Sequence, residues 1–128
     1  MTDGLTQSYK QSAVQFLKMV TDGKIKEGYE KFVDITGRHH NMYFPAGFPA
    51  LRQAMIDNEI KFPHKRFTIK NVIAEGDLVA VHSHVVLIEG EKGMAVVHMF
   101  RFKEDKIVEM WDCGQAIPED CPNNDGVF

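Results

Sequence analysis

The sequence predicts an α+β fold in which a long, curved antiparallel sheet forms a cone around three N-terminal helices. Apolar residues recur at helical spacing in the first half of the chain. Beyond Pro63, four runs rich in Val, Ile, Phe and Thr are separated by short turns, which is typical of an antiparallel meander. A length of 128 residues, with 44% hydrophobic and 26% charged residues, indicates one globular domain covering residues 1–128.

Three helices are expected before the sheet. In residues 6–20 the apolar positions form one stripe, and Gly23 follows as a stop signal. A second helix is expected over residues 25–33, so that the two form a helical hairpin. Residues 38–44 read as an extended stretch. The third helix is expected over residues 49–58, because the proline at its start suits the first turn of a helix.

Four strands are expected to make the sheet. They cover residues 66–74, 78–88, 94–102 and 106–116, and the turns between them are residues 75–77, 89–93 and 103–105. These runs are longer than the typical strand of about five or six residues. We therefore expect the sheet to bend at bulges, with the three helices filling its concave side.

Alternation of side chains along each strand predicts which polar residues share a face. His82 and His84 share one face of the second strand, His98 lies on a face with two phenylalanines, and Asp112 lies on a face with Met110. The opposite faces of the last two strands carry charged side chains that would be costly to bury. We therefore expect all three histidines and Asp112 to line the concave side.

Such a cluster of titratable groups in an apolar setting is typical of a functional site. Taken alone, a histidine in a strand is more often a hydrogen-bonded structural residue or an exposed one. Asp112 is the strongest candidate for a catalytic residue, because a carboxylate on an apolar face suits acid or base catalysis. Its alternative role is that of a buried structural partner of the Trp111 backbone or of a neighbouring histidine.

A second group of candidates precedes the third helix. In the sequence His39-His40-Asn41, one histidine is expected to reach the mouth of the cavity and the other to face solvent. Apolar side chains are expected to line the pocket together with Asn41, although such stripes are as often plain core. The candidates are Phe44, Phe48, Met55, Phe100 and Met110.

Composition excludes several classes of protein. A formal charge of −3, with Lys and Arg spread along the chain, offers no basic surface for nucleic acid. No apolar run reaches the roughly 18 residues that would span a membrane, and the polar start is unlike a signal peptide, so we expect a cytoplasmic protein. In that reducing compartment Cys113 and Cys121 are expected to be free thiols.

Several segments together resemble a known family. They are VVHMFRFKEDKIVEMWDCGQAIPE at 96–119, HHN at 39–41, GFPAL at 47–51, EGDLVAVHSH at 75–84 and NNDGVF at 123–128. They resemble the SnoaL-like, polyketide cyclase-like family of the nuclear transport factor 2-like superfamily. The resemblance implies that superfamily's cone-shaped, cystatin-like α+β roll, a small-molecule pocket and no cofactor.

The resemblance also implies roles for individual residues. Asp112, in the Trp-Asp pair, matches the acidic residue that acts as acid or base in cyclase members. His98 stands where ketosteroid isomerase relatives carry an acid that donates to an oxyanion, and His40 or Asn41 stands near the position of their base. The leading hypothesis is a cofactor-independent lyase or isomerase in which Asp112 and His40 or His98 move a proton next to a carbonyl.

Three other interpretations stay open. The superfamily also contains proteins that only bind a ligand, so the pocket need not be catalytic. A metal site at His82, His84 and His98 is the weaker alternative, suggested by a partial cupin motif whose second half is missing. Finally, a homodimer through the convex face is expected, because some apolar side chains would otherwise be exposed there. They are Val79, Val81, Val85, Val97 and Met99.

Overall fold

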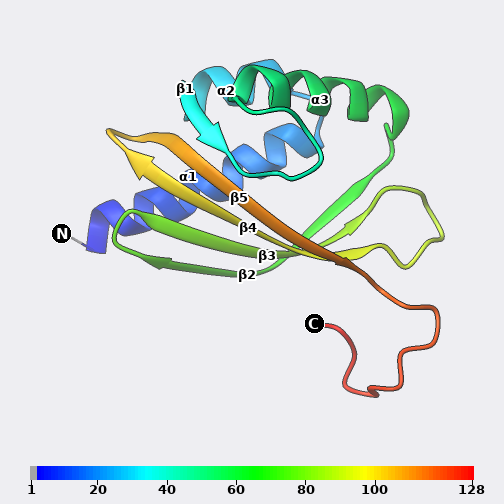
Figure 1. The fold of residues 1–128 in the computed structure, drawn as a ribbon. Helices are drawn as coiled ribbons and strands as arrows, with labels where there is room; N and C mark the ends of the chain where they lie inside the picture. Colours follow the sequence, from blue (N-terminus) through cyan, green and yellow to red (C-terminus); the bar gives the residue numbers. More distant parts are fainter. Residues whose placement is uncertain (1–2) are drawn as a thin grey trace.

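A computed structural model describes residues 3–128, which form three helices and five strands (Figure 1). In chain order these are α1 (Asp3–Thr21), α2 (Ile25–Phe32), β1 (Val33–His39), α3 (Phe48–Lys61), β2 (Arg66–Glu75), β3 (Leu78–Val86), β4 (Met94–Lys103) and β5 (Lys106–Ala116). The strands form one curved, unclosed sheet in the order β1-β5-β4-β3-β2. All three helices lie on one side of it. The predicted α+β class and the cone are confirmed.

The edge strand β1 differs from the prediction. The extended stretch was expected at residues 38–44, but it begins at Val33, directly after α2, and ends at His39. It pairs with β5 in parallel, whereas the other strand pairs are antiparallel. Val33 takes extended backbone angles (φ −113°, ψ 132°), so the chain leaves the helix one residue earlier than expected and enters the sheet at once.

The predicted bulges are present, and one of them alters which residues face inward. The β4–β5 register shifts between Arg101 and Phe102, so Phe100 opposes Met110 while Phe102 opposes Ile107. Simple alternation would put Met110 and Ile107 on opposite faces of β5. The bulge turns both toward the helices, where they are 5% and 0% exposed.

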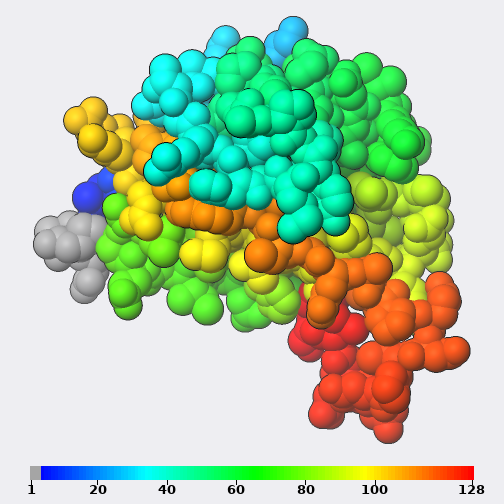
Figure 2. Space-filling model, viewed as in Figure 1, coloured from blue at the N-terminus to red at the C-terminus, as the bar shows by residue number. Residues whose placement is uncertain are grey.

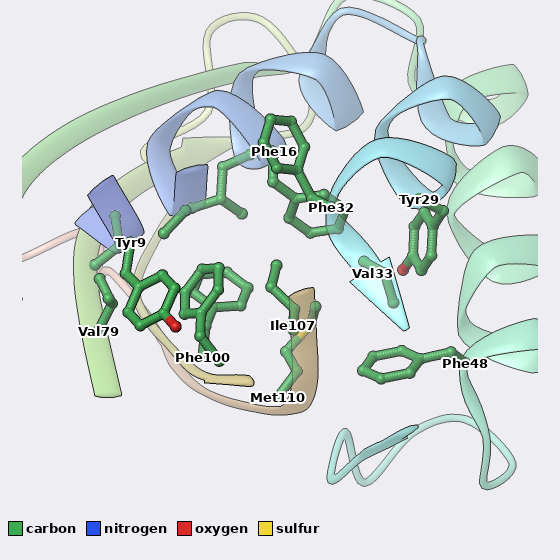
Figure 3. Packing of buried hydrophobic residues seen from close by; sticks show 14 of the residues in the cluster. Tyr9, Phe16, Tyr29, Phe32, Val33, Phe48, Val79, Phe100, Ile107 and Met110 are labelled. Atoms are coloured by element: carbon green, nitrogen blue, oxygen red, sulfur yellow. The ribbon is translucent and has the colours of Figure 1, made fainter. Parts of the chain in front are cut away.

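The core lies between the helices and the inner face of β4 and β5, where the labelled side chains of Figure 3 point toward one another. The Tyr9 ring of α1 stacks on Phe102 at 4.5 Å between centroids. Phe16 of α1 meets Phe100 edge to face at 5.9 Å, and Tyr29 of α2 meets Phe48 of α3 at 6.3 Å. Phe48, Phe100 and Met110, which we expected to line a pocket, therefore belong to the packed core.

The inner face of β3 is the one that carries valines. Val79 and Val81 are both 0% exposed, and Val85, four residues beyond Val81 on the same face, pairs with Phe67 and Met94. The expected convex patch is therefore wrong for these three residues. Val97 and Met99 of β4, which oppose His82 and Ala80, do lie on the outer face.

Gly37 of β1 lies so close to the backbone of β5 that a side chain does not fit there, and its replacement should destabilise the fold. A Cβ atom there would overlap the carbonyl oxygen of Val108 and lie 2.9 Å from the Phe48 ring. Because backbone is in the way, we expect Gly37→Ala to lower the free energy of unfolding by about 3 kcal/mol, the upper part of the range for overpacked sites. Urea unfolding measures this. Gly4→Ala, where nothing lies within 4 Å, is the control and should cause no loss.

Candidate functional site

A histidine and a carboxylate lie opposite each other on the inner face of the sheet. His98 of β4 pairs with Asp112 of β5, and on its other side it pairs with the buried Val81 of β3. Directly opposed residues share a face, so the sheet brings His98 and Asp112 together on the concave side, as expected. The aromatic rings of Phe67 and Phe100 lie 5.7 and 6.0 Å from the His98 ring.

The His98 imidazole is held neutral. Its Nδ1 atom is buried and has no hydrogen-bond partner among residues 3–128. Burial lowers the pKa of His98, and the nearby charge of Asp112 opposes this effect without reversing it. A neutral imidazole with an unpartnered nitrogen can donate to or accept from a bound molecule, depending on its tautomer.

Asn41 fixes the carboxylate of Asp112. Its Nδ2 donates to Asp112 Oδ2 at 2.7 Å, and its Oδ1 accepts the backbone N–H of Tyr43 at 2.9 Å. The β1–α3 loop (residues 40–47) is thereby held against β5, as Figure 2 shows. Asn41, which the sequence predicts as a substrate contact, thus also orients Asp112. Phe44 of this loop is 36% exposed, and Met55 of α3 packs partly buried against the core.

The buried histidine of the doublet is His39, which the sequence did not single out. It is 7% exposed, and both of its nitrogens are engaged. Nδ1 accepts the backbone N–H of Asn41 at 3.1 Å, so Nε2 carries the proton and donates to the carbonyl of Pro45 at 2.8 Å. His39 therefore anchors the two ends of the loop and offers no free nitrogen to a ligand.

His40 lies on the outer face, and the expectation that it joins Asp112 is wrong. Its ring stacks on Trp111 at 5.2 Å, and its Nε2 is 2.6 Å from Glu109 Oε2. Arg38 Nε donates to the same oxygen at 3.1 Å. The hydrogen bond from His40, and then the charge of Arg38, lower the pKa of Glu109. His40 thus takes part in a surface ion-pair cluster.

His82 and His84 also lie on the outer face, so the expectation that they share a surface with His98 is wrong. Alternation correctly places the two together, but the valine face of β3 is the one that packs against the helices. His82 Nδ1 lies 3.1 Å from Asn71 Nδ2, and His84 Nε2 donates to the carbonyl of Lys92 at 2.7 Å. Both rings contact Phe128 of the C-terminal segment.

This arrangement removes the alternative of a metal site at His82, His84 and His98, because two of these ligands lie on the other side of the sheet. Within residues 3–128 no group of three His, Cys, Asp or Glu side chains is placed to hold a metal ion.

Cys113 and Cys121 are free and exposed, as expected. No helix in this part of the chain is long and apolar enough to cross a membrane.

Two surface hollows lie away from the His98–Asp112 pair. One, of about 380 Å³, lies between α1 and β2, and the other, of about 290 Å³, lies where α3 meets the β3–β4 turn. Their linings include neither His98 nor Asp112. The β1–α3 loop, which Asn41 ties to Asp112, carries the apolar side chains of Met42 and Tyr43, each 82% exposed.

Comparison with known proteins places the chain in a family. The SnoaL-like domain profile matches residues 15–110, which include most of the helices and the sheet. The chain belongs to the SnoaL-like family. The match covers His98 of the SnoaL-like domain and ends two residues before Asp112. No curated protein matches the chain.

Solved structures confirm the fold of this SnoaL-like protein. The proposed hydroxylase AclR from Streptomyces galilaeus has a TM-score of 0.72 at 17% identity, covering 86% of this chain and 90% of its own. A proposed polyketide cyclase from Acidithiobacillus ferrooxidans has a TM-score of 0.68 at 18% identity, with 89% and 91% covered. An NTF2-like protein of unknown function from Cytophaga hutchinsonii has a TM-score of 0.69 at 10% identity, with 84% and 89% covered. At these identities the likeness shows the fold alone.

The lowered pKa of His98 predicts that acid destabilises the fold. The unfolded chain takes up a proton at His98 near the ordinary pKa of 6.5, whereas the folded chain takes it up only at lower pH. In this window the unfolded state binds more protons, so the free energy of unfolding should fall as the pH is lowered. Urea unfolding between about pH 5 and pH 8 measures the slope.

Two variants test whether His98 causes this dependence of the free energy of unfolding on pH. His98→Gln should flatten it, while His82→Gln, on the outer face, should leave it as in the wild type. Glu109 contributes only at lower pH, because its pKa is lowered from an ordinary value of 4.5. A His98→Gln protein with an unchanged slope would contradict the burial of the neutral ring.

Proposed function

We propose that this SnoaL-like protein is a cofactor-independent enzyme that moves a proton on the carbon next to a carbonyl group. Its substrate is a small, largely apolar carbonyl compound, and the reaction is of the isomerase, lyase or aldol-cyclase type. The observation that carries the proposal is the facing pair of His98 and Asp112 on the inner side of the sheet. Asp112 acts as the base, and His98 binds the carbonyl oxygen.

The spacing of the pair suits this division of roles. Directly opposed residues in antiparallel strands have Cβ atoms about 4.5–5.5 Å apart, which lets one carbonyl group contact both side chains. Asp112 removes the proton from the carbon, and the electron pair moves onto the oxygen to give an enolate. His98, in the tautomer that carries its proton toward the substrate, donates to this oxygen. The proton then returns at another carbon, or the enolate attacks a second carbonyl.

The surroundings favour a largely apolar substrate. Phe67 and Phe100 flank His98, and the exposed side chains of Met42 and Tyr43 lie on the loop that Asn41 ties to Asp112. An apolar setting also strengthens the hydrogen bond between His98 and a developing negative charge, because water does not compete for it.

The second candidate function is binding without turnover. It is favoured by His39, whose two nitrogens are both occupied by backbone groups. The inner face therefore offers a substrate one histidine with an unpartnered nitrogen among the described residues. Under this alternative a ligand would bind and be released unchanged.

Proton exchange tests the proposal without knowledge of the natural substrate. NMR in heavy water should show enzyme-dependent deuterium uptake next to the carbonyl of at least one member of a panel of cyclic ketones. Asp112→Asn should slow this uptake by about 10²–10⁴-fold, the usual contribution of a general base. Asp120→Asn makes the same chemical change in the exposed C-terminal segment and should have no effect. Full activity of a folded Asp112→Asn protein would exclude Asp112 as the base.

We also propose that the protein forms a homodimer through the outer face of the sheet. The apolar part of this surface contains Val97 and Met99, together with Trp111 from β5, which is paired with Met99. Burial of such a patch against its copy removes apolar area from water. Solution scattering should report twice the mass of one chain, and Met99→Lys should shift the population to monomers. A wild-type monomer at working concentration would overturn this proposal.

A further inference from the structure

Ser83 of β3 is a buried polar residue with no partner. It is 0% exposed, and its Oγ atom makes no hydrogen bond with any residue that the structure describes. Among residues 3–128, only one other buried side-chain nitrogen or oxygen lacks a partner, and that atom is Nδ1 of His98. Buried polar groups are nearly always hydrogen-bonded, so two exceptions on one surface require an explanation.

The two atoms belong to neighbouring positions on the inner face. Ser83 pairs with Val96 of β4, and His98 follows Val96 by two residues, so Ser83 and His98 are diagonal neighbours. Diagonal neighbours on one face have Cβ atoms within about 7–8 Å of each other. One small molecule can therefore contact Ser83 and His98 at the same time. On the β2 side Ser83 pairs with Ile69, which packs partly buried against the core.

Folding alone does not account for a serine at this position. Val79 and Val81, on the same face of the same strand, are fully buried and apolar. A valine or alanine at position 83 would continue that surface without leaving a hydroxyl unsatisfied. Serine also has a smaller side chain than valine. Both properties suit a group that contacts a ligand.

We propose that Ser83 is a second polar contact of the substrate site, and that the site takes compounds with two oxygen functions, such as alkoxyketones, hydroxyketones or dicarbonyls. The Ser83 hydroxyl donates to one oxygen, and His98 binds the carbonyl oxygen that reacts. This inference rests on the proposed ligand site at His98, but it does not require that the ligand reacts. In the described part of the chain the Ser83 hydroxyl has no hydrogen-bond partner that could act as a base, so we assign it a role in binding only.

A matched pair of probes tests the inference. 4-Chromanone and 1-tetralone differ in a single ring position, which is an ether oxygen in the first compound and a methylene group in the second. The wild type should bind 4-chromanone about five- to tenfold more tightly, the effect of one hydrogen bond to an otherwise unsatisfied group. Ser83→Ala should abolish this preference and change the affinity for 1-tetralone by less than about twofold. Titration followed by NMR measures both dissociation constants.

Two controls make the outcome specific. Ser8→Ala removes a hydroxyl from the exposed surface of α1 and should keep the preference. In the absence of ligand, Ser83→Ala should have an unchanged or higher urea midpoint, because the hydroxyl has no partner in the free protein. A clearly lower midpoint would show that the hydroxyl is bonded within the free protein, through a buried water for example, and would overturn the inference.

The binding result is independent of catalysis. A preference for 4-chromanone that disappears in Ser83→Ala supports the role of Ser83 even if no deuterium exchange is found, in which case the proposed enzymatic function fails alone. Exchange that depends on Asp112, together with equal affinities for the two probes, would leave the enzyme proposal standing and overturn the role of Ser83. Failure of both probes to bind the wild type would also overturn it, because a site of this chemistry should accept them.

Discussion

The packing of Phe100 and Phe102 against α1 is the constraint on which the rest of the structure depends. Phe100 meets Phe16, and Phe102 stacks on Tyr9, so the β4 strand can present only one face to the helices. Because side chains alternate, a buried Phe100 forces the residue two positions earlier, His98, onto the same inner face. The pairing of β4 with β5 then brings Asp112 opposite it. The polar pair is thus positioned by the aromatic core beside it.

This arrangement lowers the stability of the fold at two polar side chains on the inner face. Nδ1 of His98 and Oγ of Ser83 are buried without partners, and both oppose folding. Further toward the helices, the same face carries only apolar side chains, whose burial offsets that cost. Local conflicts of this kind tend to mark functional sites, because selection for folding alone would remove them.

The sequence was sufficient for the fold class and for placing His98 and Asp112 on the same concave face, but it could not determine which face of β3 is buried. Both faces of that strand are rich in apolar residues, and alternation only separates them. Which face of β3 is buried depends on the pairing of Val81 with His98, which is a contact between two strands and not a property of the β3 sequence alone. Similarly, β1 contains Asp34 and Arg38, so it has the composition of a loop. Its parallel pairing with β5, more than 70 residues away, makes it a strand and turns His39 inward rather than His40.

The surroundings of the two carboxylates of β5 are the reason why we propose Asp112, and not Glu109, as the base. Glu109 and Asp112 are three residues apart with no bulge between them, so they project from opposite faces of the sheet. Glu109 is surrounded by Arg38, His40 and Arg101, which favour its ionised form and make it a weak base. Asp112 instead receives a hydrogen bond from a neutral amide and faces a neutral imidazole. Among residues 3–128 no ion pair involves Asp112, and its position facing His98 is what supports it as the proposed base.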